Sequence, residues 1–309
     1  MITSFFRALS LITCCAAWFA CGPAQKIRLN TNVIPSGKTF AYQQTTTSTT
    51  ILESSEEKTV TSEKNIQHFT YTFLQKNPDG SSSWRAHITR YQTISGTVEA
   101  VSHFDTDHLE KEQDPIRALI FKKLVHSPFR FTVQPDGVIS GMNGMDELWK
   151  AVSDSIEPAK KPAFEMMMKQ FGDQFLTDAI KNTWSFYPSK AVRKGKKWKK
   201  DSIITLFNAK SHVSYYLDDI FANEVAITSS TIIKGDPKAP GEIKMGPAQI
   251  NYFLNGQGTG HIHLDPIFGM VITSEALLLL EGKMEIKVPY LASQAMPVTI
   301  KTKVLLEQQ

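Results

Sequence analysis

The chain has 309 residues, of which 41% are hydrophobic and 21% are charged, and its formal net charge is +4. A chain of this length and composition can bury a generous core without disulfides, which excludes a disordered protein and a small disulfide-held scaffold. The slight positive excess does not favour a nucleic-acid partner, which would require a concentrated basic surface.

An export signal is predicted at the N-terminus. Residues 1–7 carry one positive charge, at Arg7, and the stretch from Ala8 to Ala20 is apolar. A run of roughly 13 residues is shorter than the ~20 needed to span a bilayer, so we expect it to be removed. Residues 1–20 are therefore predicted to be a signal peptide, and residues 21–309 a single β-rich domain.

The cysteines sharpen this prediction, because all three lie near the N-terminus, at Cys14, Cys15 and Cys21. Ala20 is the small residue that a bacterial lipoprotein signal places before its acylated cysteine, so Cys21 is the expected site of cleavage and lipid attachment. Trp18 departs from the leucine usual in such signals, and cleavage after Ala24 is the alternative. The expected location is the cell envelope, either as a membrane-anchored lipoprotein facing the periplasm or the exterior, or as a soluble secreted or periplasmic protein.

The first third of the mature chain is predicted to form antiparallel strands. From Lys38 to about Val101, β-branched and aromatic residues alternate with polar ones, which is typical of half-buried strands. The turn residues 77–80 should join two long strands as a hairpin. A helix is expected near 114–126, followed by a strand at 129–133 and a turn at 135–137.

The middle of the chain changes to helical spacing. Met145, Leu148 and Val152 recur at the helical period, and a helical insert is predicted at about 143–182. Its second half has an aromatic and methionine-rich face, which could line an adaptable apolar pocket or pack on the sheet. That face comprises Phe164, Met166, Met167, Met168, Phe171 and Phe175.

Strands resume after Trp184 and continue to the end of the chain. The predicted strands are 202–207, 213–217, 224–234, 249–254, 259–264, 270–279, 284–290 and 298–306, with glycines such as Gly256, Gly258, Gly260 and Gly282 at their ends. Strands, then helices, then strands favour an α+β fold: a large curved antiparallel sheet with a helical insert packed on it.

The chain resembles an uncharacterised bacterial family, a domain of unknown function found on exported and lipoprotein-type proteins. The residues that carry the resemblance are 29–42, 133–138 with Gly141, 186–188, 195–198, 256–260, 264–265 and Gly269. It covers about residues 26–306. It implies an envelope protein whose sheet is similar to the curved sheets of periplasmic lipoprotein carriers, and it implies no activity, cofactor or catalytic residue.

Two polar segments are candidate metal sites. His103, Asp105 and Asp107 would share one face of a strand, and so would His261, His263 and Asp265. One strand supplies only part of a metal-binding shell, so polar strand ends are the simpler interpretation of both segments. If the two strands were neighbours, they could together form a metal-dependent hydrolase site.

Residues 193–200 form a basic cluster around Trp198. Cations near a membrane attract anionic headgroups, with Trp198 at the interface; the alternative is a solvated turn with Trp198 in the core. The cations are Arg193, Lys194, Lys196, Lys197, Lys199 and Lys200.

No motif indicates a particular reaction. The glycines at 256, 258 and 260 precede alternating strand-like residues, whereas a phosphate-binding loop precedes a helix. A Gly-x-Ser-x-Gly elbow and a His-Glu-x-x-His motif are absent from the sequence. We therefore expect no cofactor, and a binding or carrier role for an apolar ligand or an envelope protein partner. The alternatives are a hydrolase that uses the His/Asp strands, or a purely structural envelope component.

Overall fold

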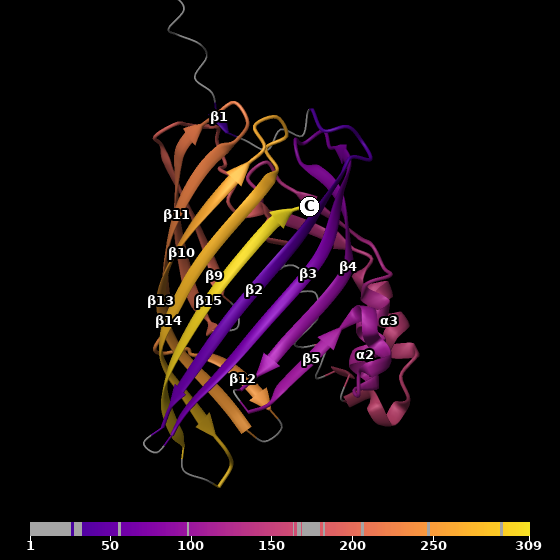
Figure 1. The fold of residues 1–309 in the computed structure, drawn as a ribbon, viewed down its shortest axis with the longest axis vertical. Coiled ribbons are helices and arrows are strands. Elements are labelled where there is room, and N and C mark those ends of the chain that lie inside the picture. Colours follow the sequence, from indigo (N-terminus) through magenta and orange to yellow (C-terminus); the bar gives the residue numbers. More distant parts are fainter. Residues whose placement is uncertain are drawn as a thin grey trace, which may run out of the picture.

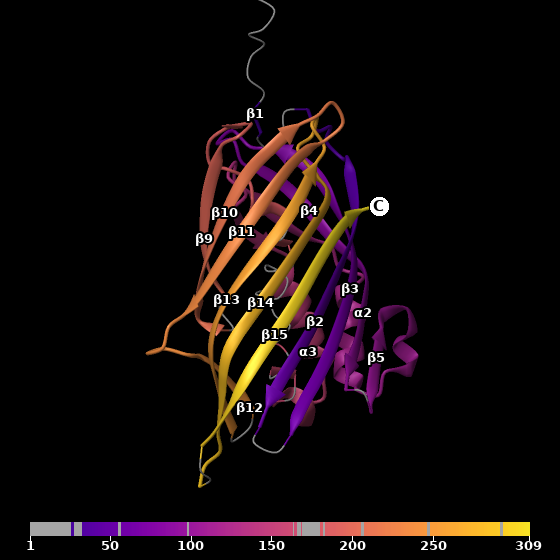
Figure 2. The same cartoon turned by 60° about the vertical axis from the view of Figure 1, so that its left-hand side comes forward.

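The structure is a computed structural model that describes residues 26–27, 33–54, 57–97, 99–162, 164–165, 168, 180–181, 183–204, 207–245, 248–290 and 293–309. One antiparallel sheet of 13 strands dominates it, in the order β7-β6-β4-β3-β2-β15-β14-β13-β11-β10-β9, with β5 paired to β4 and β12 to β13. Figures 1 and 2 show that this sheet is strongly curved. The prediction of a large curved antiparallel sheet is confirmed.

The strands are long and lie mostly in hairpin order. Their bounds are β2 Thr39–Glu53, β3 Lys58–Lys76, β4 Ser82–Gly96, β5 Val101–Asp105, β6 Phe129–Val133, β7 Ile139–Asn143, β9 Lys197–Ile204, β10 Ala209–Ile220, β11 Val225–Gly235, β12 Gly241–Met245, β13 Ala248–Leu264, β14 Val271–Lys287 and β15 Gln294–Gln308. A separate two-stranded sheet pairs β1 (Lys26–Ile27) with β8 (Val192–Arg193).

Local turn chemistry explains the first hairpin. The Gly80 N–H donates to the Asn77 carbonyl oxygen, and Gly80 has a φ of 86° that favours glycine. Asp79 accepts from the Ser81 N–H at 2.9 Å, which closes the turn. The predicted β3–β4 hairpin is confirmed.

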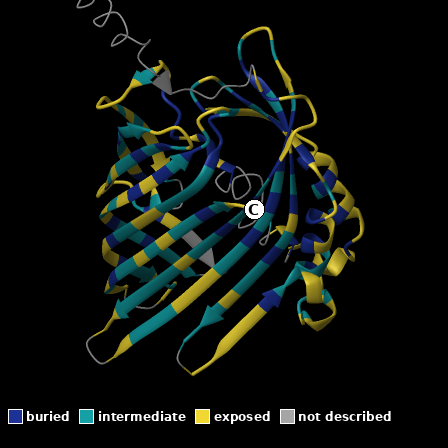
Figure 3. Cartoon of the chain, turned by 45° about the horizontal axis from the view of Figure 1, so that its top comes forward, coloured by how far each residue is buried: buried dark blue, intermediate teal, exposed yellow. Residues whose placement is uncertain are grey.

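Alternation along the strands separates two faces of the sheet (Figure 3). We call inward the face that carries Tyr42, Leu280 and Ile233, which are all buried, and outward the opposite face. Because the side-chain period of a strand is two, every second residue of each strand belongs to each face. The polar threonines of β2, such as Thr47 and Thr49, thus lie on the outward face.

An aromatic core fills the inward face at the end of the sheet where β2 begins. The rings of Trp84 and Trp184 are 4.8 Å apart between centroids, and Tyr71 lies 5.6 Å from Trp184. Nearby, Tyr187 donates a hydrogen bond to the Gly269 carbonyl oxygen in the β13–β14 loop. Residues 183–187 therefore tie β3 and β4 to the other half of the sheet across its inward face.

A smaller apolar cluster occupies the inward face at the opposite end of the strands. Its buried members are Ala209, Ile233, Leu254, Leu280, Met284 and Val298. They come from five strands, β10, β11, β13, β14 and β15, so packing across the sheet holds the far ends of these hairpins together.

Few helices have both ends within the described residues. They are η1 (Thr106–Lys111), α2 (Pro115–Leu124), α3 (Met145–Asp154) and η2 (Pro158–Lys160). Residues 161–162, 164–165, 168, 180–181 and 183–184 are also helical. Phe121 of α2 stacks on Tyr91 of β4, with centroids 4.7 Å apart. Among the described residues, no helix is long and apolar enough to cross a bilayer.

The predicted helical insert at 143–182 is described only in part. Its first helix is α3, whose Met145, Leu148 and Val152 are buried as the periodicity predicts. Met166, Met167, Phe171 and Phe175 lie outside the described residues, so the packing of the insert on the sheet stays a prediction.

Two of the predicted strand boundaries were wrong. Residues 249–254 and 259–264 belong to one strand, β13, and residues 270–279 and 284–290 correspond to β14, which ends at Lys287. The glycines expected at strand ends therefore lie in strand interiors. On the inward face of β13, a Cβ at Gly256 would approach the Leu280 Cδ2 atom to 2.5 Å, and one at Gly258 would approach the Leu277 carbonyl oxygen to 2.6 Å. Close backbone contact with β14, and not a bulge or turn, requires glycine there.

Candidate functional site

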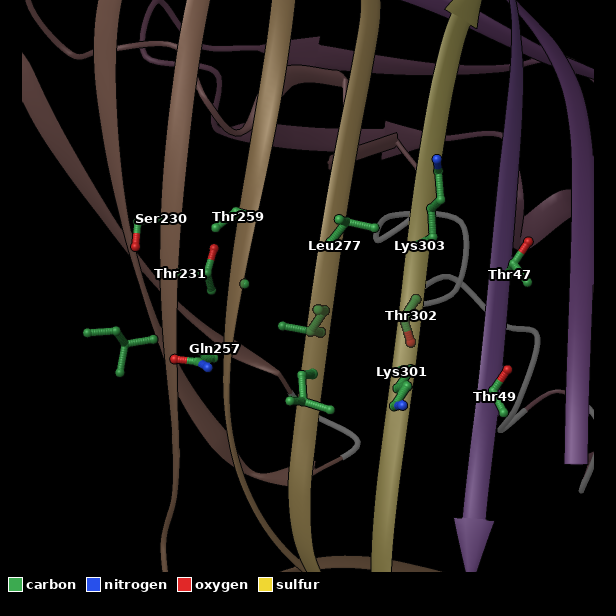
Figure 4. A pocket seen from close by; sticks show the side chains of 14 residues that line it. Thr47, Thr49, Ser230, Thr231, Gln257, Thr259, Leu277, Lys301, Thr302 and Lys303 are labelled. Atoms are coloured by element: carbon green, nitrogen blue, oxygen red, sulfur yellow. The ribbon is translucent and has the colours of Figure 1, made fainter. Parts of the chain in front are cut away.

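A hollow of about 740 Å³ on the outward face is a candidate site, which we call the transverse groove. Five neighbouring strands, β2, β15, β14, β13 and β11, contribute its lining (Figure 4). Its walls are two rows of paired outward residues. They comprise Thr47, Lys303, Leu277, Thr259 and Ser230 in one row, and Thr49, Lys301, Leu279, Gln257 and Ile232 in the other.

Strand geometry explains the shape of this groove. Successive outward residues on one strand are about 6.8 Å apart, and neighbouring strands lie about 4.8 Å apart. The space between the two rows therefore crosses five strands and is about 19 Å long. Its volume is within the range of small-molecule sites, roughly 300–1,000 Å³.

The transverse groove has apolar side chains at its centre, on β14, and at its β11 end. Leu277 of β14 is 48% exposed and Ile232 of β11 is 52% exposed. Such exposed apolar side chains within a hollow mark binding surfaces more often than isolated ones do. The groove therefore offers an apolar surface to a ligand.

One end of the transverse groove is basic. Lys303 Nζ lies 3.0 Å from Glu275 Oε2, so its charge is compensated. Lys301 is exposed, and no ion pair to it occurs within the described part of the chain. Lys301 is thus available to an anionic group of a ligand.

A second hollow, of about 440 Å³, adjoins the first on the outward face of β9, β10 and β11. Its outward lining residues are Lys197, Ser214, Tyr216, Thr228 and Ser230. Ser230 lines both hollows, so the two are neighbours on one continuous surface.

The predicted basic cluster lies at the edge strand of the sheet. Some of its cations bind other residues of the protein, and others are exposed. Lys194 Nζ binds Asp219 Oδ2 at 2.7 Å. Lys200 Nζ donates to the Asp136 carbonyl oxygen at 2.7 Å and lies 3.6 Å from its carboxylate. These two cations are therefore engaged by the protein itself.

The other four cations are exposed. Lys197 Nζ lies 5.7 Å from the centre of the Tyr216 ring. For Arg193, Lys196 and Lys199, no ion pair is found within the described ranges. Their charges therefore face solvent, as contact with an anionic surface requires.

Trp198 is half-buried and packs against the core. Its Nε1 donates to the Phe186 carbonyl oxygen at 2.7 Å, and its ring stacks on Tyr215 with centroids 5.3 Å apart. This packing agrees with the alternative that places Trp198 in the core, and a role at a membrane interface stays a prediction.

The first candidate metal segment is an ion-pair network. β5 ends at Asp105, so Asp107 lies in η1 and not on the strand face. Arg90 binds Asp105 at 2.7 Å and Asp107 at 2.8 Å, while His103 stays exposed. Burial raises the pKa of Asp105, but hydrogen bonds from Arg90, from the Asp107 N–H and from Gln92 outweigh it and lower the pKa to about 2.

The side chains of the second candidate segment make separate interactions and do not converge on one point. His261 is exposed, whereas His263 Nδ1 lies 3.2 Å from Glu224 Oε2. Asp265 follows β13 and accepts hydrogen bonds from the N–H groups of Ile267 and Phe268 at 2.8 and 2.7 Å. Asp265 therefore shapes the β13–β14 loop.

The two segments are not neighbours. β5 pairs with β4, whereas β13 lies between β14 and β11. The strands β3, β2, β15 and β14 separate β4 from β13 in the sheet. In the part of the chain that the structure describes, no group of three or more His, Cys, Asp or Glu side chains is placed to hold a metal ion. The joint site that the hydrolase alternative requires is not assembled.

The remaining predicted site residue, Cys21, lies outside the described residues, as does Ala24. One feature of the sequence does indicate the transverse groove, namely a run of leucines. Residues 277–280 are four consecutive leucines within a strand. Since alternate residues face opposite sides, two of them had to lie on the outward face.

The sequence from residue 80 to residue 271 matches the model of DUF6263, described as a family of unknown function. A comparison with curated proteins finds no match. Solved structures give only distant similarity. DynF from the dynemicin biosynthesis pathway of Micromonospora chersina is 6% identical over 92% of this chain and 85% of that chain, with a TM-score of 0.22.

Two further structures match at the same level. OccK7 (OpdD) of Pseudomonas aeruginosa is 5% identical over 88% of this chain and 99% of that chain, with a TM-score of 0.23. The translocator domain of the autotransporter NalP from Neisseria meningitidis is 5% identical over 91% of both chains, with a TM-score of 0.18. Similarities this low support no conclusion about function.

Proposed function

The chain belongs to DUF6263, a family of unknown function, and we propose that it is an exported envelope protein, tethered to a membrane through lipid on Cys21, that binds an amphiphile instead of catalysing a reaction. The observation that carries the binding role is the transverse groove. Its centre is apolar and its free cation, Lys301, lies beside that centre. An apolar chain with an anionic head matches both features.

The proposed role is that of a carrier, which the apolar residues and the cation of the transverse groove support. The chain of the ligand would lie across Leu277, Leu279 and Ile232, and its head beside Lys301. Binding a chain of this kind removes exposed apolar surface from water, which supplies the driving force at roughly 25 cal/mol per Å². The charge of Lys301 would determine the orientation of the ligand, because it would attract the anionic head to its side of the groove.

Binding can be measured with a fluorescent long-chain fatty acid. Leu277→Glu places a carboxylate in the apolar centre, and we expect it to weaken binding at least about tenfold, which corresponds to 1.4 kcal/mol. Lys301→Ala should weaken it about threefold to fivefold by removing the charge that faces the head. Ile203→Glu is the matched control, because Ile203 is an aliphatic residue, 63% exposed, on the edge strand β9 outside the groove.

The endogenous ligand is identified by mass spectrometry of lipids that co-purify with the protein under mild extraction. We expect an acidic amphiphile that the Leu277→Glu protein lacks. If the wild-type protein neither binds the probe nor retains a lipid, the carrier role is wrong and a structural envelope component takes its place.

The tether has its own test. Cys21→Ser removes the acylated side chain, so the variant should move from the membrane fraction to the soluble envelope fraction. A variant that fractionates like the wild type would show that Cys21 is not the anchor. This result leaves the groove experiment unaffected, because fatty-acid binding is measured on purified protein.

A further inference from the structure

The N-terminal end of the described chain is fixed beside the basic cluster. Lys26 pairs with Arg193 and Ile27 with Val192 in the β1–β8 ladder. Cys21 precedes Lys26 by five positions in the sequence. Five extended residues reach at most about 18 Å, so a lipid on Cys21 would hold Arg193 within that distance of its membrane.

Two cations at this end form no ion pair within the part of the chain that the structure describes. Lys194 engages Asp219, whereas Arg193 and Lys196 flank the turn at Gly195 and are exposed. Among the described residues, this end of the molecule therefore presents two exposed cations without a carboxylate partner.

Apolar side chains are exposed on the loops next to these cations. Phe221 is 48% exposed and Ile267 is 61% exposed. The β10–β11 loop that holds Phe221 follows Asp219, the partner of Lys194. The β13–β14 loop that holds Ile267 begins just after His263, whose Nδ1 lies 3.2 Å from Glu224 Oε2 of the β10–β11 loop.

A third loop continues the same end of the sheet. Lys38 Nζ lies 6.0 Å from the centre of the Phe268 ring, which places the 33–38 segment beside the β13–β14 loop. Val33 in this segment is 45% exposed. We call the whole surface the basic rim; it consists of Val33, Arg193, Lys196, Phe221 and Ile267.

We infer that the basic rim docks on the surface of an anionic lipid bilayer. Free cations attract anionic headgroups, and the interleaved Phe221 and Ile267 can enter the interface between headgroups and acyl chains. The orientation rests on the proposed tether, which would bring the rim close to the ~8–10 Å range over which charges act at ordinary ionic strength. A bilayer fits the tether, the charge and the apolar loops together.

The charge component is tested with vesicles and the full-length Cys21→Ser protein, so that lipid attachment plays no part. Vesicles of phosphatidylglycerol and phosphatidylcholine should bind it, and vesicles of phosphatidylcholine alone should bind it far less. Because each basic residue near the surface contributes about fivefold, the double change Arg193→Glu and Lys196→Glu should reduce binding at least about 25-fold. Raising the salt to about 1 M, where the Debye length is about 3 Å, should remove most of the binding.

The matched control has the same charge change at the opposite end of the sheet. Lys210 and Lys234 are exposed and paired across β10 and β11. Lys210→Glu with Lys234→Glu should leave vesicle binding unchanged. If this control lowers binding as much as the rim variant does, the attraction reflects net charge and the inference is wrong.

The apolar component is tested in the same assay. Phe221→Ser and Ile267→Ser should each weaken binding roughly fivefold, because each removes apolar area that enters the interface. Tyr290→Ser is the control, since Tyr290 is fully exposed in the turn after β14, far from the rim. Thermal unfolding should show that all these variants remain folded.

Orientation is measured on the tethered protein. No cysteine follows Cys21 in the sequence, so Ile267→Cys or Tyr290→Cys introduces one thiol for a fluorescent label. A nitroxide on the lipid headgroups should quench the label at position 267 and not at 290. Equal quenching at both positions, or vesicle binding that ignores the rim changes, would refute docking. A soluble Cys21→Ser protein that still binds anionic vesicles would support docking even if the wild type proves unlipidated.

Discussion

Asp105 should stabilise the fold through its charge, in a manner that depends on pH. Arg90 donates to both carboxylate oxygens, from Nη2 at 2.7 Å and from Nε at 3.1 Å, and Gln92 donates at 2.7 Å. These bonds hold the ionised form and lower the pKa from 3.8 to about 2. Asp105→Asn keeps the shape of the side chain and removes the charge.

The size of the effect follows from the shift in pKa. One pKa unit corresponds to 1.36 kcal/mol, so the full shift sets an upper limit of roughly 2.5 kcal/mol. The side chain of Arg90 is 34% exposed, and solvent screens the pair, so we expect about 1 kcal/mol at pH 7. Since the folded pKa is depressed, this stabilisation is complete well above pH 3.8 and is lost as the pH falls towards 2.

Urea unfolding of the wild type and of Asp105→Asn at two pH values measures this contribution. The difference in unfolding free energy should be about 1 kcal/mol at pH 7 and about half of that at pH 3. Asp107→Asn is the matched control and should cost less, because the Asp107 side chain is 51% exposed. A difference that is equal at both pH values would contradict the charge argument. A zinc-dependent rise in Tm that only Asp105→Asn abolishes would make Asp105 a metal ligand instead.

Two further substitutions test the packing of the sheet. Gly256→Ala should lower the unfolding free energy by about 1–3 kcal/mol, because its Cβ would lie 2.4 Å from a carbonyl oxygen of β14; Thr259→Ala, at an exposed site of the same strand, should change it by less than about 0.5 kcal/mol in the same urea titration. Tyr187→Phe should cost about 1–3 kcal/mol by leaving the buried Gly269 carbonyl without its donor, whereas Tyr290→Phe, at a fully exposed site, should be neutral.

Local signals predicted the parts of the fold that local chemistry determines. The Asn77–Gly80 turn and the alternation of β3 placed the first hairpin, because glycine and aspartate act within four residues of the chain. Met145, Leu148 and Val152 placed the buried face of α3 for the same reason, since a helix repeats within one turn.

Contacts between distant segments explain what local signals missed. Gly256 and Gly258 were taken for strand ends, because a glycine weakens a strand considered alone. Their cause lies in β14, whose backbone and leucines approach them across the sheet. The pairing of Lys26 with Arg193 joins positions far apart in the sequence, and no local pattern near either position predicts it.

The proposed tether and the basic rim would have different effects: lipid on Cys21 would hold the molecule at the membrane, and a polybasic surface would add electrostatic attraction to anionic lipids. The rim would also restrain the orientation of the molecule on the membrane, because Arg193 and Ile267 belong to different loops and both would have to reach the membrane surface.

The rows of the transverse groove begin at Leu277, six residues along β14 from Val271, which starts next to the rim. At about 3.4 Å per residue, the groove then stands at most about 20 Å from the rim along the strand. A ligand in the groove would therefore lie outside the bilayer, so the proposed tethered carrier would hold its amphiphile in the aqueous phase beside the membrane.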